Sequence, residues 1–374
     1  MSKPVKYHYG KFPPTNIDWH RLIPLIGPAN SSLARYDGVL SVIPNPAVLL
    51  SPLTTQEAVL SSKIEGTQTT MEEVLEFEAE EEKSDLTLEQ KSDIFEVLNY
   101  RKAIRIAINL LQNLPLCNRV ICEAHKVLMS NVRGGNKAPG KFRKMQNWIG
   151  PKLKPIDAAK FVPISPDKLP DGMCIWEKYI HNKDVQDRLV QLALLHVEFE
   201  ALHPFNDGNG RVGRMFVPLF LYKMDLIKSP MFYISEYFEA NRDEYYERLL
   251  AVSRDNDWTG WCSFFLNAVK SQASKNQKKV SGILDIYEKT KKSIHDLTHS
   301  QYSMHALDFI FERPVFRSTE LVKTGKIPAP SSKKILADLR KAGIINVLKR
   351  SSGRRPAVYV FSELLNIAEG KEVF

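Results

Sequence analysis

The chain has 374 residues, of which 43% are hydrophobic and 25% charged, and a formal net charge of +9. This length allows a large core and two or three domains, and the composition is that of a globular protein, which excludes a disordered or disulfide-rich chain. No run of about 18 apolar residues is present and the N-terminus lacks an apolar signal core, so we expect a cytoplasmic protein without a membrane span.

The N-terminal part predicts an arm followed by helices. The first 50 residues are rich in proline and aromatic side chains, and we expect an ordered arm with a helix or two. Thr54 and Glu57 have the spacing of a capping box at the start of a helix. Thr70 and Glu73 form a second box, which opens an acidic helix. Two further helices are predicted between residues 87 and 131.

Glycine and proline then interrupt the helical pattern over residues 134–167. Long helices return over 184–223 and from 239 to about 296. Residues 189–202 are nearly all apolar, and residues 212–220 are apolar at i, i+3, i+4 spacing, so both are expected to be buried helices around a polar loop. The first 300 residues therefore predict a mainly α fold with one irregular insertion.

The polar loop, residues 203–214, reads HPFNDGNGRVGR and is the most informative stretch of the chain. Gly208 and Gly210 permit a tight turn before a helix, whose first N–H groups and positive dipole end favour an anion. Arg211 and Arg214 are three residues apart on the first turn, so both can grip phosphate oxygens. The loop therefore predicts a polyphosphate site.

Two more residues of the loop suit phosphate chemistry. Asp207 is its single carboxylate, and a Mg²⁺ ion that bridges phosphates usually takes one or two carboxylates plus water. His203 changes its charge near neutral pH, which makes it the natural general base. A helix-loop-helix turn with solvated arginines is the alternative, and the number of matching residue types argues against it.

At these residues the chain resembles the Fic family of nucleotidyl transferases, whose motif H-x-F-x-[D/E]-G-N-G-R-x-x-R it matches at every specified position. The resemblance implies that His203 deprotonates a hydroxyl group on a target protein. The oxygen then attacks the α-phosphate of ATP, AMP is transferred and pyrophosphate leaves. Phe205 would anchor the loop in the core.

The resemblance also assigns the rest of the ATP site. Asp207 would hold Mg²⁺, and residues 208–210 would form an anion hole in which Asn209 also fixes the α-phosphate. Arg211 and Arg214 would hold the β- and γ-phosphates. Adenine would lie against side chains near Tyr233 and Asn241, where packing of aromatic rings in the core is the alternative.

Two further segments extend the resemblance. Residues 139–150 (PGKFRKMQNWIG) are similar to the segment before the family's flap, a β-hairpin expected near 140–167 that aligns an extended stretch of the target protein. A surface loop with a buried Trp148 is the alternative. Upstream, residues 61–66 fit the family's inhibitory pattern [S/T]-x-x-x-E-[G/N], through Ser61, Glu65 and Gly66.

The position of Glu65 in the inhibitory pattern has a physical consequence. Glu65 falls in the last turn of a predicted helix, where a carboxylate faces the negative end of the dipole unless a cation compensates. The resemblance implies that Glu65 pairs with Arg214 and occupies γ-phosphate space, with Ser61 helping to orient the glutamate. A solvated glutamate at a helix end is the alternative. Some relatives with this glutamate also remove AMP from targets.

Residues 301–374 predict three helices and a hairpin, which resemble a small winged-helix domain. This segment has 13 Lys and Arg against 7 Asp and Glu, an excess that suits nucleic-acid phosphates. Dimerisation or protein contact is the alternative, because beyond Ser331 and Ser332 the candidate recognition helix has few base-reading residues. The candidates for phosphate contact are Lys333, Lys334, Arg340, Lys349, Arg350, Arg354 and Arg355.

Together these features predict an N-terminal arm and helical region with the inhibitory motif (1–112), a Fic catalytic core (113–300) and the winged-helix-like domain (301–374). The expected protein is a self-inhibited, ATP- and Mg²⁺-dependent protein adenylyltransferase that modifies a Ser, Thr or Tyr hydroxyl of a target or of itself. A homodimer is left open. The alternatives are transfer of another phosphate-containing group and a DNA-binding regulator that senses nucleotides.

Overall fold

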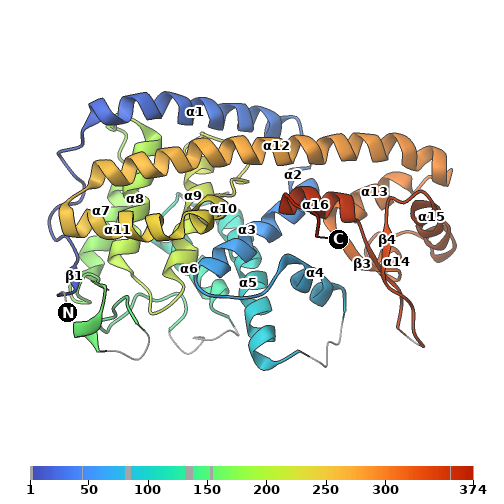
Figure 1. The fold of residues 1–374 in the computed structure, drawn as a ribbon, viewed down its shortest axis with the longest axis horizontal. Coiled ribbons are helices and arrows are strands. Elements are labelled where there is room, and N and C mark those ends of the chain that lie inside the picture. The colour runs from blue at the N-terminus through green and yellow to red at the C-terminus, as the bar shows by residue number, and fades with distance from the viewer. Residues whose placement is uncertain are drawn as a thin grey trace. The chain divides into compact units, whose positions relative to one another are not determined.

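The computed structural model describes residues 3–43, 45–80, 86–130, 138–151, 155–353 and 355–373. Helices dominate the fold, as the sequence predicts, and the few strands are short (Figure 1). The chain forms two compact units. The first comprises Met1–Asp37, Leu60–Thr67 and Leu98–Ser274, and the second comprises Gly38–Val59, Gln68–Val97 and Lys275–Phe374. The three consecutive domains expected from the sequence remain a prediction.

Four long helices contribute residues to both units: α1 (Trp19–Ser41), α3 (Ser51–Ile64), α5 (Leu88–Leu110) and α12 (Trp258–Thr298). Helix α3 begins at Ser51, so the capping box expected at Thr54 and Glu57 is wrong and both residues lie inside the helix. Pro52 explains the earlier start, because proline suits the first turn of a helix, where its missing N–H has no partner to lose.

The first unit is organised around α8 (Arg188–Leu202) and α9 (Asn209–Lys223), which pack against each other. Asp187 starts α8 by accepting hydrogen bonds from two backbone N–H groups at 2.9 Å. Nearly all side chains of both helices are buried, and each large apolar one contributes roughly 1.5–3 kcal/mol. The loop between them is therefore held at both ends by core helices.

Four shorter helices surround this pair: α6 (Asn118–Leu128), α7 (Leu169–Ile180), α10 (Ser235–Ala240) and α11 (Arg242–Asp255). Helices α7 and α11 pack on α8, α6 packs on α9, and α10 packs on α11. The loop thus lies among helices that come from distant parts of the chain.

The segment where the flap is expected contains one antiparallel bridge, and the flap itself remains a prediction. Phe161 forms an antiparallel bridge with Ile149, and a 3-10 helix, Ile156–Ala158, lies between them. Residues 152–154 are outside the described part of the chain. Strand β2 (Phe161–Val162) also pairs in parallel with β1 (Val5–Lys6), so the N-terminal arm supplies its other neighbour. Trp148 is 43% exposed, which contradicts the alternative of a loop around a buried tryptophan.

The second unit contains α2 (Pro46–Leu49), α4 (Met71–Ala79) and the C-terminal elements. The latter run in the order α13 (Ser303–Glu312), β3 (Val315–Arg317), α14 (Glu320–Lys323), α15 (Ala329–Lys341), β4 (Asn346–Lys349), β5 (Val358–Val360) and α16 (Ser362–Glu369). Strand β5 lies between β3 and β4 and is antiparallel to both. The hairpin expected from the sequence is present as β4 and β5, whereas β3 and α16 were not expected, and the winged-helix domain remains a prediction.

Helix α4 begins as predicted. Glu73 N donates to Thr70 Oγ1 at 3.2 Å and Thr70 N donates to Glu73 Oε2 at 3.0 Å, which confirms the second capping box. Helix α4 packs on β3, and α2 packs on α13. Among the described helices, none is long and apolar enough to cross a membrane.

Candidate active site

His203 ends α8 in the left-handed conformation, with φ 47° and ψ 60°. Its Nδ1 lies 3.2 Å from the carbonyl oxygen of Glu200. Because a carbonyl oxygen can only accept, Nδ1 carries the proton of the neutral ring and Nε2 keeps its lone pair. Burial lowers the pKa of His203 to about 4. The imidazole is therefore neutral at pH 7, with Nε2 available as a base.

A buried arginine fixes the backbone on either side of this histidine. Arg143 Nε donates to the carbonyl oxygen of His203 at 2.9 Å, and its Nη2 donates to Leu202 at 3.3 Å and to Ile164 at 2.5 Å. Its backbone N donates to Pro204 at 2.9 Å. Burial lowers the pKa of Arg143 to about 10, which leaves the guanidinium charged at neutral pH. The sequence placed this residue before the flap but did not reveal that it joins the flap to the loop.

His125 on α6 holds the other side of the loop. Its Nδ1 accepts from Gly140 N at 2.8 Å, so its Nε2 carries the proton and donates to the Asp207 carbonyl at 3.0 Å. The ring stacks on Phe205 at 3.7 Å, with an interplanar angle of 5°. Burial lowers the pKa of His125 to about 4, so the ring stays neutral. Phe205 is fully buried, which confirms it as a core anchor.

The glycine and asparagine of the loop shape the start of α9. Gly208 precedes the helix with φ 76°, a conformation that favours glycine. Asn209 Oδ1 accepts from Phe205 N, and its Nδ2 donates to Phe205 O, both at 2.8 Å. The Asn209 amide therefore closes the loop, and the expected contact with an α-phosphate stays a prediction.

Asp207 is the only carboxylate of the loop. Its Oδ1 accepts from Gly208 N at 2.7 Å and lies 3.7 Å from Arg211 Nη2, and the side chain is 36% exposed. The described residues contain no cluster of three or more His, Cys, Asp or Glu that would hold a metal without further ligands. A single accessible carboxylate fits Mg²⁺, which keeps several waters and shares phosphate oxygens.

The predicted ion pair between Glu65 and Arg214 is confirmed. Arg214 Nη2 lies 2.6 Å from Glu65 Oε1, and the arginine side chain is 1% exposed against 34% for the glutamate. Burial alone would raise the pKa of Glu65, but Arg214 outweighs it and holds that pKa below its ordinary value. Burial alone would lower the pKa of Arg214, and the Glu65 carboxylate raises it above the ordinary range.

Ser61 contacts Arg214 and not the carboxylate it was expected to orient. Arg214 Nε donates to Ser61 Oγ at 2.9 Å, and Nη2 donates to Ser61 O at 2.8 Å. The reason is geometric: Ser61 lies in the last turn of α3 and Glu65 directly follows the helix, so both reach Arg214 at the same helix end. Serine and glutamate thus hold the guanidinium together.

The carboxylate of Glu65 also lies on the start of α9. A Cβ atom built on Gly210 would stand 2.2 Å from Glu65 Oε1 and 3.0 Å from Arg214 Nη1. Gly210 is therefore the residue whose missing side chain leaves room for an anion against the first turn of α9. That turn is where N–H groups and the dipole favour negative charge, and the Glu65 carboxylate lies beside it.

Two residues that the sequence did not single out hold the end of α3. Arg242 Nη2 donates to Ile64 O at 2.6 Å, and Tyr246 OH donates to the same oxygen at 3.3 Å. The chain then turns at Gly66, whose φ is 106°. A positive charge at a helix C-terminus is favourable. Arg242 therefore places a positive charge on the last carbonyl of α3, next to the Glu65 carboxylate that Arg214 neutralises.

Tyr233 and Asn241, the residues expected to contact adenine, make no described contact with the loop of residues 203–214. Tyr233 is 8% exposed and its hydroxyl lies 3.1 Å from Met231 Sδ, so its ring is packed in the core. Asn241 joins α10 to α11, and its Nδ2 donates to Tyr237 O at 2.9 Å. Both assignments stay predictions.

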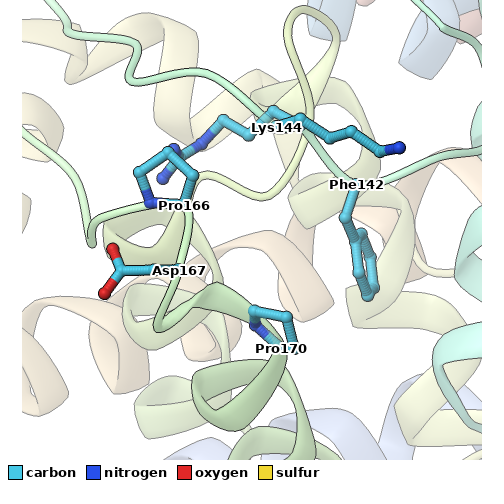
Figure 2. Close-up of a pocket in the computed structure, with 6 residues that line it drawn as sticks. Phe142, Lys144, Pro166, Asp167 and Pro170 are labelled. Carbon is cyan, nitrogen blue, oxygen red and sulfur yellow. The ribbon is translucent and has the colours of Figure 1, made fainter.

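An open pocket of about 610 Å³ lies at the base of the flap. Figure 2 shows the Phe142 ring and the Asp167 carboxylate on opposite sides of it, with the Lys144 side chain above Phe142 in the view. Pro166, Pro170 and Arg143 complete the lining. Because Arg143 donates to the His203 carbonyl, the pocket adjoins the segment that carries the candidate base.

Comparison with known families agrees with this geometry. The family model described as Fic/DOC family N-terminal matches residues 23–109, and the family model described as Fic/DOC family matches residues 115–221. Together the two matches cover more than half of the chain. The chain therefore belongs to the Fic/DOC family.

Two curated relatives are named as protein adenylyltransferases. The chain is 26% identical to a probable protein adenylyltransferase of Aquifex aeolicus, aq_aa38, over 52% of this chain and 56% of the relative. It is also 26% identical to protein adenylyltransferase fic-1 of Caenorhabditis briggsae, over 28% of this chain and 18% of that protein. The similarity thus spans about half of the first relative and a small part of the second.

Solved structures share the fold. A Fic family protein from Desulfovibrio desulfuricans G20 superposes with a TM-score of 0.57 at 19% identity, over 93% of this chain and 98% of that one. A Fic domain containing signaling protein from Bacteroides thetaiotaomicron VPI-5482 has a TM-score of 0.54 at 17% identity, over 69% and 97% of the two chains. At these identities the likeness concerns the fold alone.

Proposed function

We propose that this protein transfers AMP from ATP to a Ser, Thr or Tyr hydroxyl of a target protein or of itself. One observation carries the proposal: the hydrogen bond from His203 Nδ1 to Glu200 O leaves a neutral ring with a lone pair on Nε2, in the loop that leads into α9. The names of the two curated relatives agree with this reaction.

In the proposed reaction, the target hydroxyl gives its proton to His203 Nε2 as its oxygen bonds to the α-phosphorus of ATP. The bond between the α-phosphorus and the bridging oxygen breaks, and pyrophosphate leaves with that electron pair. The backbone N–H groups at the start of α9 and the guanidinium of Arg211 lower the energy of the developing negative charge. Arg214 would bind the terminal phosphate once Glu65 has released it.

Asp207 would hold Mg²⁺, and the ion, when bound with ATP, supplies positive charge to the phosphate oxygens. His125 and Arg143 keep the loop in place through its backbone. The flap and its adjoining pocket, with Lys144 and Asp167 on its walls, would receive the target segment next to the hydroxyl.

We further propose that Glu65 restrains the enzyme. The glutamate neutralises Arg214 and sits where an anion would bind on α9. An ATP γ-phosphate and the Glu65 carboxylate would compete for the same cation and the same helix end. Removal of AMP from a modified target is a second candidate activity of the same site.

The test incubates the full chain and its Glu65→Gly variant with cell lysate and either α-labelled or γ-labelled ATP. Label from the α-position alone, with an added mass of AMP on the target peptide, is expected. Label from the γ-position would instead show phosphate transfer. The proposal would be overturned if neither protein produced label, or if the label persisted when His203 is replaced with alanine.

A further inference from the structure

The second unit has a basic surface that AMP transfer does not use. On α15 the core side is mainly apolar, with Ile335, Leu336 and Leu339 buried together with Ser332, and α14 buries Leu321 and Glu320. The opposite side carries exposed cations, namely Lys323, Lys326, Lys333, Lys334, Arg340 and Lys341. The element therefore separates a core face from a cationic face.

The arrangement of this surface resembles a known way of binding duplex nucleic acid. Helices α14 and α15 pack together, and in a helix-turn-helix the second helix enters the major groove while cations contact the backbone. Ser332, a base-reading candidate from the sequence, is 2% exposed and faces the core. The surface therefore carries cations but few side chains that could hydrogen-bond to base edges. Such a surface suits contact with the phosphate backbone whatever the base sequence.

The paired strands β4 and β5, here called the wing, carry one candidate cation that is already paired with carboxylates. Lys349 ends β4, and its Nζ lies 3.0 Å from Glu76 Oε2 and 2.5 Å from Glu80 Oε1. Glu76 lies in the last turn of α4 and Glu80 directly follows the helix, so both carboxylates stand at its C-terminal end. Two carboxylates of the same unit thus take the place that phosphate oxygens would take on this lysine. Arg354, another wing candidate, is outside the described residues.

The contact is part of how α4 folds. The helix is started by the Thr70 capping box and buries Met71, Val74 and Leu75. Glu80 stands at its C-terminal end, where a carboxylate is unfavourable unless a cation compensates. Partial burial would lower the pKa of Lys349, but the two carboxylates outweigh it and raise that pKa. The amine is therefore charged and held by α4 at neutral pH.

We propose that α15 and the wing form a docking surface for the phosphate backbone of duplex nucleic acid, and that α4 competes with this backbone for Lys349. The exposed lysines of α15 make the first contacts. Full engagement of the wing requires Glu76 and Glu80 to release Lys349. This inference does not depend on AMP transfer.

The test measures binding of a short fluorescent DNA duplex of arbitrary sequence to the full chain by anisotropy at several salt concentrations. The double variant Glu76→Gln, Glu80→Gln is expected to bind roughly three- to tenfold more tightly at low salt, with a salt slope steeper by about 0.9 for one added phosphate contact. Lys333→Ala with Lys334→Ala is expected to flatten the slope by about 1.8.

Glu72→Gln is the matched control, because it removes a carboxylate from α4 that makes no described contact with Lys349; its slope is expected to equal that of wild type. Adding Lys349→Ala to the double variant should abolish the gain, and circular dichroism should show all variants folded. An equal gain from Glu72→Gln, or an unchanged slope in the double variant, would overturn the competition. Failure to bind the duplex at low salt, or equally tight binding of polyglutamate, would overturn nucleic acid as the partner.

Discussion

Replacing Glu65 with glycine should change stability and activity in opposite directions. In the absence of nucleotide, the variant leaves a buried guanidinium without its carboxylate. Breaking a fully buried pair costs about 3–5 kcal/mol. Here Glu65 is 34% exposed and Arg214 keeps two hydrogen bonds to Ser61, so we expect a loss of about 1–3 kcal/mol in the free energy of unfolding.

With ATP present the same change should be favourable. The γ-phosphate can take over Arg214 and the start of α9 without displacing a carboxylate, a difference of about 2–3 kcal/mol. This corresponds to an AMP-transfer rate roughly 30- to 150-fold higher. Bound ATP should also restore stability more in the variant than in wild type, because ligand binding to the folded state stabilises it in proportion to affinity.

The assay combines denaturant unfolding without nucleotide, thermal melting across ATP concentrations and initial rates with α-labelled ATP. Lys63→Ala is the matched control: it breaks the ion pair with Glu239 at 3.2 Å near the same end of α3, where the lysine side chain is 53% exposed. We expect it to change neither quantity by more than about 0.5 kcal/mol. Adding Arg214→Ala to Glu65→Gly should remove most of the gain in rate. The reasoning is refuted if Glu65→Gly is less stable yet transfers AMP no faster, since Arg214 would then be unimportant for the phosphates.

His203→Ala should lower AMP transfer by at least about 100-fold while ATP binding, measured by calorimetry, stays within about threefold; a folded variant with a tenth of the wild-type rate would contradict its role as base. Asp207→Ala should shift the Mg²⁺ dependence of the initial rate to higher concentrations, and an unchanged titration would mean that another group holds the ion. His125→Phe keeps a ring against Phe205 but loses two hydrogen bonds, so it should destabilise the fold by about 2 kcal/mol and lower kcat more than it raises KM for ATP. Burial lowers the pKa values of His125, His196 and His203 to about 4, 3 and 4. Because the unfolded chain binds more protons between the unfolded value of about 6.5 and these values, stability should fall as pH is lowered through that window, by up to roughly 1.4 kcal/mol per pH unit for each histidine; a free energy of unfolding that is equal at pH 7 and pH 5 would show that these rings are not buried neutral.

The sequence by itself determined the features whose cause is local. A helix N-terminus with two glycines, two arginines three residues apart and a histidine at the end of the preceding helix needs only helix periodicity and backbone freedom to be read as a phosphate site. The Thr70 and Glu73 box could be predicted for the same reason, since both of its hydrogen bonds lie within one turn. The pairing of Glu65 with Arg214 was reached from the helix dipole and the family motif together.

Tertiary structure decided the contacts that join distant segments. Arg143 reaches the His203 carbonyl across 60 residues of chain, His125 reaches Asp207 across 82, and Arg242 reaches Ile64 across 178. No local sequence pattern predicts the hydrogen-bond partner of a buried histidine on an apolar helix face or of an arginine in a loop. Strand β3 was missed because three residues show no alternation, and only pairing with β5 keeps them extended. Local sequence thus fixed which groups can do chemistry at residues 203–214, while long-range packing decided which side chains hold them in place, because such hydrogen bonds form only when remote elements exclude water from the same site.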